Sequence, residues 1–79
     1  MEKQMTLYQL DTGRGGIIDS LTASGRLRRR LLDLGFIPGA LVTCERQSLF
    51  NDPKAYAIRG AMIALRRDEA KLIKIMPIK

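Results

Sequence analysis

The stretch RLRRRLLDLGFIPG, residues 26–39, decides the fold of this chain. Leu27, Leu31 and Leu34 recur at the spacing of one helical face, and the arginines between them fall on the other sides. Gly35 follows the last leucine, at the position where a glycine in the left-handed conformation commonly ends a helix. The pattern therefore predicts an amphipathic helix of about three turns that places its leucines on a core.

The residues next to this helix specify how the chain enters and leaves it. Ser24 or Thr22 is expected to cap the first free N–H groups with its hydroxyl oxygen. Downstream, Pro38-Gly39 joins a residue of fixed φ to one that readily adopts φ > 0, which is typical of a type II turn. We expect the chain to reverse there and to continue as a strand.

Short β patterns occupy most of the remaining chain. Alternating or β-branched residues, bounded by Gly, Asp and Pro, predict strands. We expect strands at residues 6–8, 17–21, 41–47, 55–59, 62–65 and 73–76, with one helical turn within 66–71. The alternation in the third of these segments places Val42 and Cys44 on the same face, so both side chains are assigned to the core.

These elements predict a mainly β domain of five to six short strands with one inserted amphipathic helix. Strands at intervals of roughly ten residues are typical of a small sandwich or barrel. We favour a barrel, because closing the sheet removes exposed edges that a chain of 79 residues has little material to cover. No repeat or linker interrupts the pattern, so residues 1–79 are expected to form a single domain.

The residue inventory argues against catalysis and against a metal site. The chain has no histidine and one cysteine, so it lacks the commonest general base and the ligand pair of a structural zinc site. We expect no enzyme activity, no catalytic or metal-ligating residues and no bound cofactor. The single cysteine and the lack of an apolar run near ~20 residues favour a cytoplasmic protein that is not embedded in a membrane.

The charge of the chain points to an acidic partner. Fourteen Lys and Arg against eight Asp and Glu give a net charge of +6, which attracts nucleic acid, anionic lipid or an acidic protein face. The outward sides of the expected helix carry an arginine cluster and one leucine that lies off the apolar stripe. We predict that this set binds the partner: Arg28, Arg29, Arg30 and Leu32. The alternative interpretation of the same residues is a solvated helix face.

Residues 29–39, RRLLDLGFIPG, resemble the signature of the ferrous-iron transport protein A (FeoA) family. The resemblance extends from about Leu7 to Met76. Its downstream landmarks follow in the family's order: Val42, Asp52-Pro53, Tyr56, Ile58, Gly60, Ala64-Leu65-Arg66, Glu69-Ala70 and Ile73. Lys54 departs from the family pattern at a hydrophobic position, and we interpret it as a surface substitution. The resemblance implies an SH3-like barrel with an inserted helix.

The same resemblance implies a function. Members of the family work beside the large membrane permease and GTP-binding protein of bacterial ferrous-iron uptake. We therefore expect a small cytosolic accessory protein that binds the cytosolic portion of this permease and modulates it. Family-level descriptions mention transition-metal binding, but without histidine or a cysteine pair this sequence offers no clear ligand set for iron.

The alternative function is that of a nucleic-acid-binding or transcription-related SH3-like barrel. The net charge and the arginine cluster favour it. However, the aromatic residues are few, and at least two are expected in the core, which leaves a poor platform for base stacking. They are Tyr8, Phe36, Phe50 and Tyr56. No pair of helices suited to reading DNA precedes the barrel, so a nucleic-acid partner is not expected.

Overall fold

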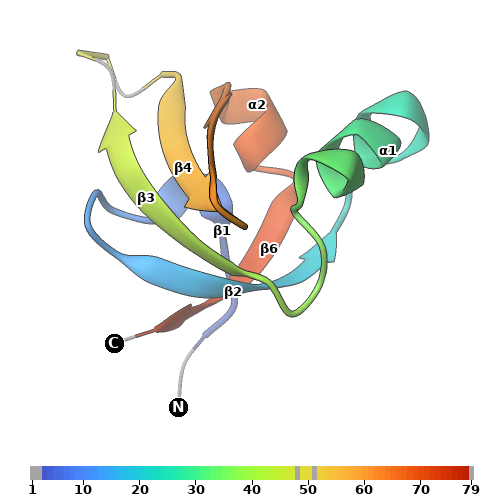
Figure 1. Cartoon of the computed structure of the whole chain (residues 1–79), viewed down its shortest axis with the longest axis horizontal. Coiled ribbons are helices and arrows are strands. Elements are labelled where there is room, and N and C mark those ends of the chain that lie inside the picture. Colours follow the sequence, from blue (N-terminus) through green and yellow to red (C-terminus); the bar gives the residue numbers. More distant parts are fainter. Residues whose placement is uncertain (1–2, 48, 51, 79) are drawn as a thin grey trace.

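The computed structural model describes residues 3–47, 49–50 and 52–78, which form one curled antiparallel sheet with a helix projecting from it (Figure 1). The elements are β1 (Met5–Thr6), η1 (a 3-10 helix, Leu7–Gln9), β2 (Gly15–Leu21), α1 (Gly25–Leu34), β3 (Leu41–Gln47), β4 (Lys54–Ile58), β5 (Ala61–Leu65), α2 (Arg67–Ala70) and β6 (Ile73–Ile78). The strand order is β1-β6-β2-β3-β4-β5. The predicted mainly β architecture with one inserted amphipathic helix is confirmed.

One apolar core lies inside the curl of the sheet. Its buried members are Leu7, Leu10, Ile18, Ala23, Leu31, Phe36, Val42, Cys44, Tyr56, Ile58, Leu65, Ala70, Ile73 and Ile75. Val42 and Cys44 are fully buried, which confirms their assignment to the core. Burial of a side chain the size of Leu31 or Phe36 contributes about 1.5–3 kcal/mol, so the junction between α1 and the barrel is a major source of stability.

The helix α1 sits on the barrel as its leucines predict. Leu31 is fully buried, and Leu27 and Leu34 pack half-buried against the core. The helix ends at Gly35, which has φ of 112° and donates its N–H to the Leu32 carbonyl at 3.0 Å. Ser24 is the N-cap residue by backbone position, but its side chain makes no capping hydrogen bond. The predicted hydroxyl cap is therefore wrong.

The first predicted strand, residues 6–8, is wrong in part. Only Met5 and Thr6 pair with β6, and the chain then turns into η1. The turn is favoured by a local bond, because the Gln9 Oε1 accepts the Thr6 backbone N–H at 2.9 Å. The Gln9 side-chain amide thus offers the Thr6 N–H an alternative to strand pairing. The strand therefore ends after two residues, and the 3-10 helix begins.

The interpretation of Lys54 as a surface residue is also wrong. Lys54 is the first residue of β4 and is only 6% exposed, because the alternation along β4 turns it to the same side as Tyr56 and Ile58. Its ammonium group donates to the carbonyl oxygens of Tyr8 at 2.6 Å and Leu10 at 3.3 Å. The end of a short helix leaves carbonyl oxygens without N–H partners. The ammonium group of Lys54 supplies hydrogen-bond donors to two such oxygens.

The sheet keeps two edges, although closure was expected to remove them. Within the described residues, β1 pairs only with β6 and β5 pairs only with β4. The turn between β4 and β5 consists of Arg59 and Gly60, with φ of 48° and 82°, the pair of positive φ values that a two-residue type I′ hairpin requires. The barrel is closed by packing of its core rather than by a continuous hydrogen-bonded ladder.

Candidate protein interface

The outward side of α1 contains a hollow of about 300 Å³ that brings together most of the predicted partner-binding residues. It is lined by Gly25, Arg28, Arg29, Leu32 and Asp33. Arg28, Arg29 and Leu32 thus share one surface, as their helical spacing allows. A half-buried leucine with guanidinium groups beside it can receive an apolar side chain and a carboxylate at the same time.

Arg28 is fixed in place by the barrel. Its Nη1 donates to the carbonyl oxygen of Leu21, at the end of β2, at 3.2 Å. This bond spans the connection between β2 and α1 and holds the guanidinium at the rim of the hollow. Because a guanidinium has five N–H donors, Arg28 retains donors for a partner's carboxylate.

Arg30 has a different position from the other three predicted residues. It does not line the hollow, and its Nη1 lies 2.7 Å from the Glu69 Oε2 in α2. The hydrogen bond from Arg30 lowers the pKa of the Glu69 carboxyl, and burial acts in the opposite direction. The structure therefore places Arg30 as a link between α1 and α2.

Arg29 and Leu32 carry the exposed chemistry of the hollow. Among the described residues, the Arg29 side chain has no hydrogen-bond or ion-pair partner, so its charge faces solvent. Leu32 is half-buried although it lies off the leucine stripe. Arg28 and Arg30 form side-chain bonds to other parts of the fold, whereas Arg29 and Leu32 form none among the described residues.

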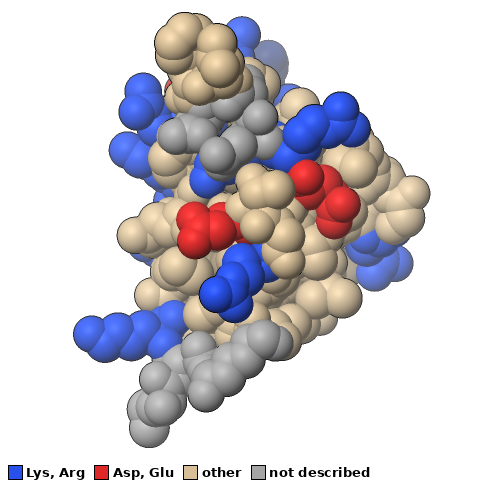
Figure 2. All heavy atoms as spheres, turned by 90° about the vertical axis from the view of Figure 1, so that its left-hand side faces the viewer, with Lys and Arg blue, Asp and Glu red and all other residues tan. Residues whose placement is uncertain are grey.

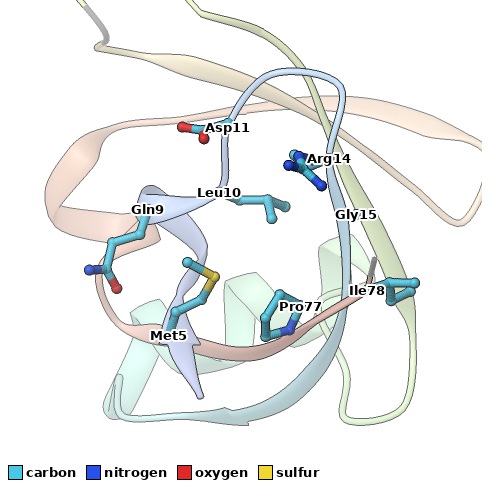
Figure 3. Close-up of a pocket in the computed structure, with 8 residues that line it drawn as sticks. All are labelled: Met5, Gln9, Leu10, Asp11, Arg14, Gly15, Pro77 and Ile78. Carbon is cyan, nitrogen blue, oxygen red and sulfur yellow. The ribbon is translucent and has the colours of Figure 1, made fainter. Parts of the chain in front are cut away.

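A second hollow, of about 200 Å³, was not found by sequence reasoning. It is lined by Met5, Gln9, Leu10, Asp11, Arg14, Gly15, Pro77 and Ile78. Figure 3 shows Met5, Leu10 and Pro77 turned toward the same space. The two ends of the sequence meet there through the pairing of β1 and β2 with β6, so no local motif could have revealed it.

The tip of the β3–β4 hairpin exposes two large apolar side chains. Leu49 is 90% exposed and Phe50 is 83% exposed. The tip stands away from the sheet at the upper left of Figure 1. In the sequence these residues follow the alternation of β3, and the only signal for their exposure is the turn chemistry of Asp52-Pro53. The sequence Asn51-Asp52-Pro53 predicts a turn after β3, but Asn51 lies outside the described residues.

The basic residues are distributed rather than gathered into one patch on the face shown in Figure 2. Blue Lys and Arg clusters are separated there by tan surface and by two red acidic groups. A groove that follows a phosphate backbone requires a continuous basic track, which this face does not offer.

In residues 3–47, 49–50 and 52–78, no three His, Cys, Asp or Glu side chains are grouped in a way that could hold a metal ion. Over the same residues, no helix is both long enough and apolar enough to span a bilayer.

Comparison with known families gives a match over almost the whole chain. The model of the FeoA domain matches residues 5–77. A putative Fe(2+) transport protein A from Campylobacter jejuni is 37% identical over 71 residues, which cover 90% of this chain and 96% of that protein. A Fe(2+) transport protein A/Fe(2+) transporter FeoB fusion protein from Porphyromonas gingivalis is 32% identical over 71 residues, covering 90% of this chain. The matched region is only 8% of the fusion protein's length.

Solved structures confirm the predicted SH3-like fold. The solution structure of iron(II) transport protein A from Clostridium thermocellum superposes with a TM-score of 0.90 at 32% identity, covering 94% of this chain and 46% of that one. A zinc-complexed FeoA from Stenotrophomonas maltophilia, described as an SH3 domain protein, gives a TM-score of 0.81 at 28% identity and covers 90% of this chain and 88% of that one.

Proposed function

This chain belongs to the FeoA domain family, whose role is in ferrous iron transport, and from that premise we propose that it is a non-catalytic accessory protein that binds and modulates the large GTP-binding iron permease. Its partner in this proposal is the cytosolic portion of the permease, and ferrous iron is the cargo of the transport rather than a ligand of this chain. The cytoplasm is the compartment in which the two would meet.

The observation that carries the choice of partner is the covalent fusion in Porphyromonas gingivalis. There, a Fe(2+) transport protein A region and a Fe(2+) transporter FeoB region form one chain. Fusion raises the effective concentration of two domains for each other, which benefits domains that act together. This supports the permease as the partner.

The α1 hollow is the surface that we assign to this contact. It combines the half-buried Leu32 with two guanidinium groups. That of Arg29 has no partner in the part of the chain that the structure describes, and that of Arg28 is fixed by its bond to Leu21. Arginine is enriched among the energetically important residues of protein interfaces. The hollow suits a partner segment that carries an apolar side chain and a neighbouring carboxylate.

The test is a binding titration of the purified chain against the cytosolic domain of the permease. Arg29→Glu and Leu32→Asp are each expected to weaken binding about tenfold or more while the circular dichroism spectrum stays unchanged. Arg46→Glu is the matched control, because Arg46 is also an exposed arginine but lies on β3. If no interaction is measured, and deletion of the gene leaves ferrous-iron uptake unchanged, the proposal is wrong.

Arg30 requires its own control, because it supports α1 through Glu69. Arg30→Glu removes the ion pair, whereas the exchange Arg30→Glu with Glu69→Arg restores it with reversed charges. Binding that is recovered by the exchange assigns Arg30 a structural role. Binding that stays lost in the exchanged variant assigns the Arg30 charge to the partner contact.

The alternative function, binding of nucleic acid, predicts a characteristic dependence of the binding affinity on salt concentration. Binding to phosphates releases counterions, so the affinity would fall steeply and linearly in a plot of log affinity against log salt. The net charge of +6 is the observation that favours it. The separated basic clusters of Figure 2 do not, and we propose no nucleic-acid role.

A further inference from the structure

The two edges of the sheet are protected to very different degrees. At one edge, β1 is two residues long and passes directly into η1, so it offers almost no strand to pair with. At the other edge, β5 has five residues, Ala61–Leu65, without proline, charge or a bulge in its pairing with β4. Natural sheets usually blunt such edges with lysine, proline or bulges, because an unprotected edge pairs with other chains.

The register of the β4–β5 hairpin identifies which backbone groups are available. Its two-residue turn makes Ile58 and Ala61 the hydrogen-bonded pair that closes the hairpin, and hydrogen-bonded pairs then alternate along the ladder. The N–H and C=O groups of Met62 and Ala64 therefore point away from β4. Within the described chain, neither residue forms any other backbone bond, and both are exposed.

The side chains around this edge are apolar along its length. Met62 and Ala64 face outward, opposite Ala57 and Ala55 of β4, whereas Leu65 is turned into the core. Met62 is 53% exposed. A strand added to β5 would thus continue an apolar surface without burying a charge or leaving a polar side chain of β5 unpaired.

Exposed positive charge lies at both ends of β5. Arg59 precedes the strand, and Arg66 and Arg67 follow it. The acidic residues Asp68 and Glu69 come after them, Glu69 paired with Arg30, and Asp52 accepts the Arg67 backbone N–H. With Arg30 counted, four arginines stand against three carboxylates, so the surroundings of the strand keep a net positive charge. A second copy of this chain, paired antiparallel about a two-fold axis, would bring arginines at one end against arginines at the other. Like charges opposed in this way disfavour self-pairing and favour acidic ends on the added strand.

We propose that β5 is a docking edge for an extended segment of another protein, which adds as a seventh strand through the outward groups of Met62 and Ala64. The segment has apolar or small residues at its centre and carboxylates at both ends, which meet Arg59 at one end and Arg66 and Arg67 at the other. Main-chain bonds give such strand additions their affinity, and complementary charges at the ends add specificity. This site is separate from the α1 hollow and does not depend on the permease as partner.

The test uses a fluorescein-labelled synthetic peptide of nine residues, with alternating valine and threonine in the middle and two acidic residues at each end. Binding is measured by fluorescence anisotropy, and the site is mapped by amide hydrogen exchange. The peptide is expected to slow exchange of the Met62 and Ala64 amides, whereas those of Ala61 and Ile63, already bonded to β4, change little. A peptide with lysines at its ends is expected to bind about tenfold more weakly.

Two variants test the contact from the side of the protein. Ala64→Pro removes an N–H that points away from β4, which an edge strand tolerates, and is expected to weaken peptide binding about tenfold. Ala64→Ser keeps the N–H and is the matched control. The double change Arg66→Glu with Arg67→Glu leaves the backbone ladder intact. It is expected to weaken binding of the acidic peptide about tenfold. This variant tests the contact even if Ala64→Pro does not fold.

Several outcomes would overturn this inference. They are protection that maps outside β5, equal binding of the acidic and lysine-ended peptides, and no binding at millimolar peptide. A concentration-dependent dimer that Ala64→Pro dissociates would assign the edge to a second copy of the chain instead. None of these outcomes bears on the α1 hollow, so this inference and the proposed function fail separately.

Discussion

The ammonium nitrogen of Lys54 lies 2.6 Å from the carbonyl oxygen of Tyr8 and 4.5 Å from the centroid of the Tyr8 ring. A single buried cation thus fixes the end of η1 to the start of β4, two segments 46 residues apart in the chain. It does so through a hydrogen bond and a cation–π contact, each favoured by partial removal from water.

Replacing this lysine by methionine keeps much of its volume and removes the charge. Lys54→Met is expected to lower the free energy of unfolding by about 1–3 kcal/mol, because the carbonyls of Tyr8 and Leu10 lose their donor. Urea denaturation monitored by circular dichroism gives the value. Lys71→Met, at an exposed position, is the control and should change stability by less than about 0.5 kcal/mol. A Lys54→Met protein as stable as the parent would show that the buried bonds contribute nothing net.

The end of α1 gives a second prediction. Gly35 has φ of 112°, and a Cβ placed there would lie 3.2 Å from the Cδ of Arg59. Gly35→Ala is therefore expected to destabilise the protein by about 1–2 kcal/mol, through backbone strain and through displacement of the arginine. The double variant Gly35→Ala with Arg59→Ala relieves the crowding but not the strain. Recovery of full stability in it would show that crowding is the only cause.

Ser24 gives a prediction opposite to the usual rule for its position. An N-cap serine changed to alanine commonly costs about 1 kcal/mol. Here the serine side chain makes no capping bond, so Ser24→Ala is expected to change the unfolding free energy by less than about 0.5 kcal/mol. Thermal unfolding of the two proteins side by side measures it. A loss near 1 kcal/mol would mean that the hydroxyl does cap the helix in solution.

The link between Arg30 and Glu69 predicts a dependence on pH. The hydrogen bond from Arg30 lowers the pKa of Glu69 in the folded state, so its stabilisation is present above the unfolded pKa and is lost as pH falls through the folded one. Arg30 is 54% exposed, and solvent screening limits the effect to about 0.5 kcal/mol. Glu69→Gln should therefore be less stable than the parent at neutral pH. In acid the two proteins should be equally stable, because the protonated Glu69 of the parent is then as uncharged as the glutamine of the variant. A difference that persists unchanged in acid would contradict this.

Local patterns were enough to predict the helix, its end at Gly35 and the core positions Val42 and Cys44. In these cases, periodicity and one glycine determine the structure within a few residues. Two other features depend on residues distant in the sequence. Lys54 is buried because carbonyl oxygens 44 and 46 residues away accept hydrogen bonds from it. The residues next to Lys54 in the sequence do not predict this contact.

For the candidate site, the sequence could predict only which side chains share a face of the helix, and their role in binding stays a prediction. Helical spacing brought Arg28, Arg29 and Leu32 to one face, where the hollow lies. The same spacing could not show that Arg30 would meet Glu69, which is 39 residues away. The hollow between the two ends of the chain depends in the same way on strand pairing across the whole sequence. Long-range pairing is set by the packing of the entire core, and single segments do not encode it.

The antiparallel pairing of β1 with β6 has a consequence for how the domain can be attached to something larger. Met5 lies opposite Ile75, and Figure 1 shows both ends of the chain leaving the barrel on the same side, away from α1 and the β3–β4 hairpin tip. A tether at either end therefore anchors the barrel at nearly the same point. A neighbouring protein joined before the domain or after it would therefore lie on the side of the barrel away from α1 and the β3–β4 hairpin tip.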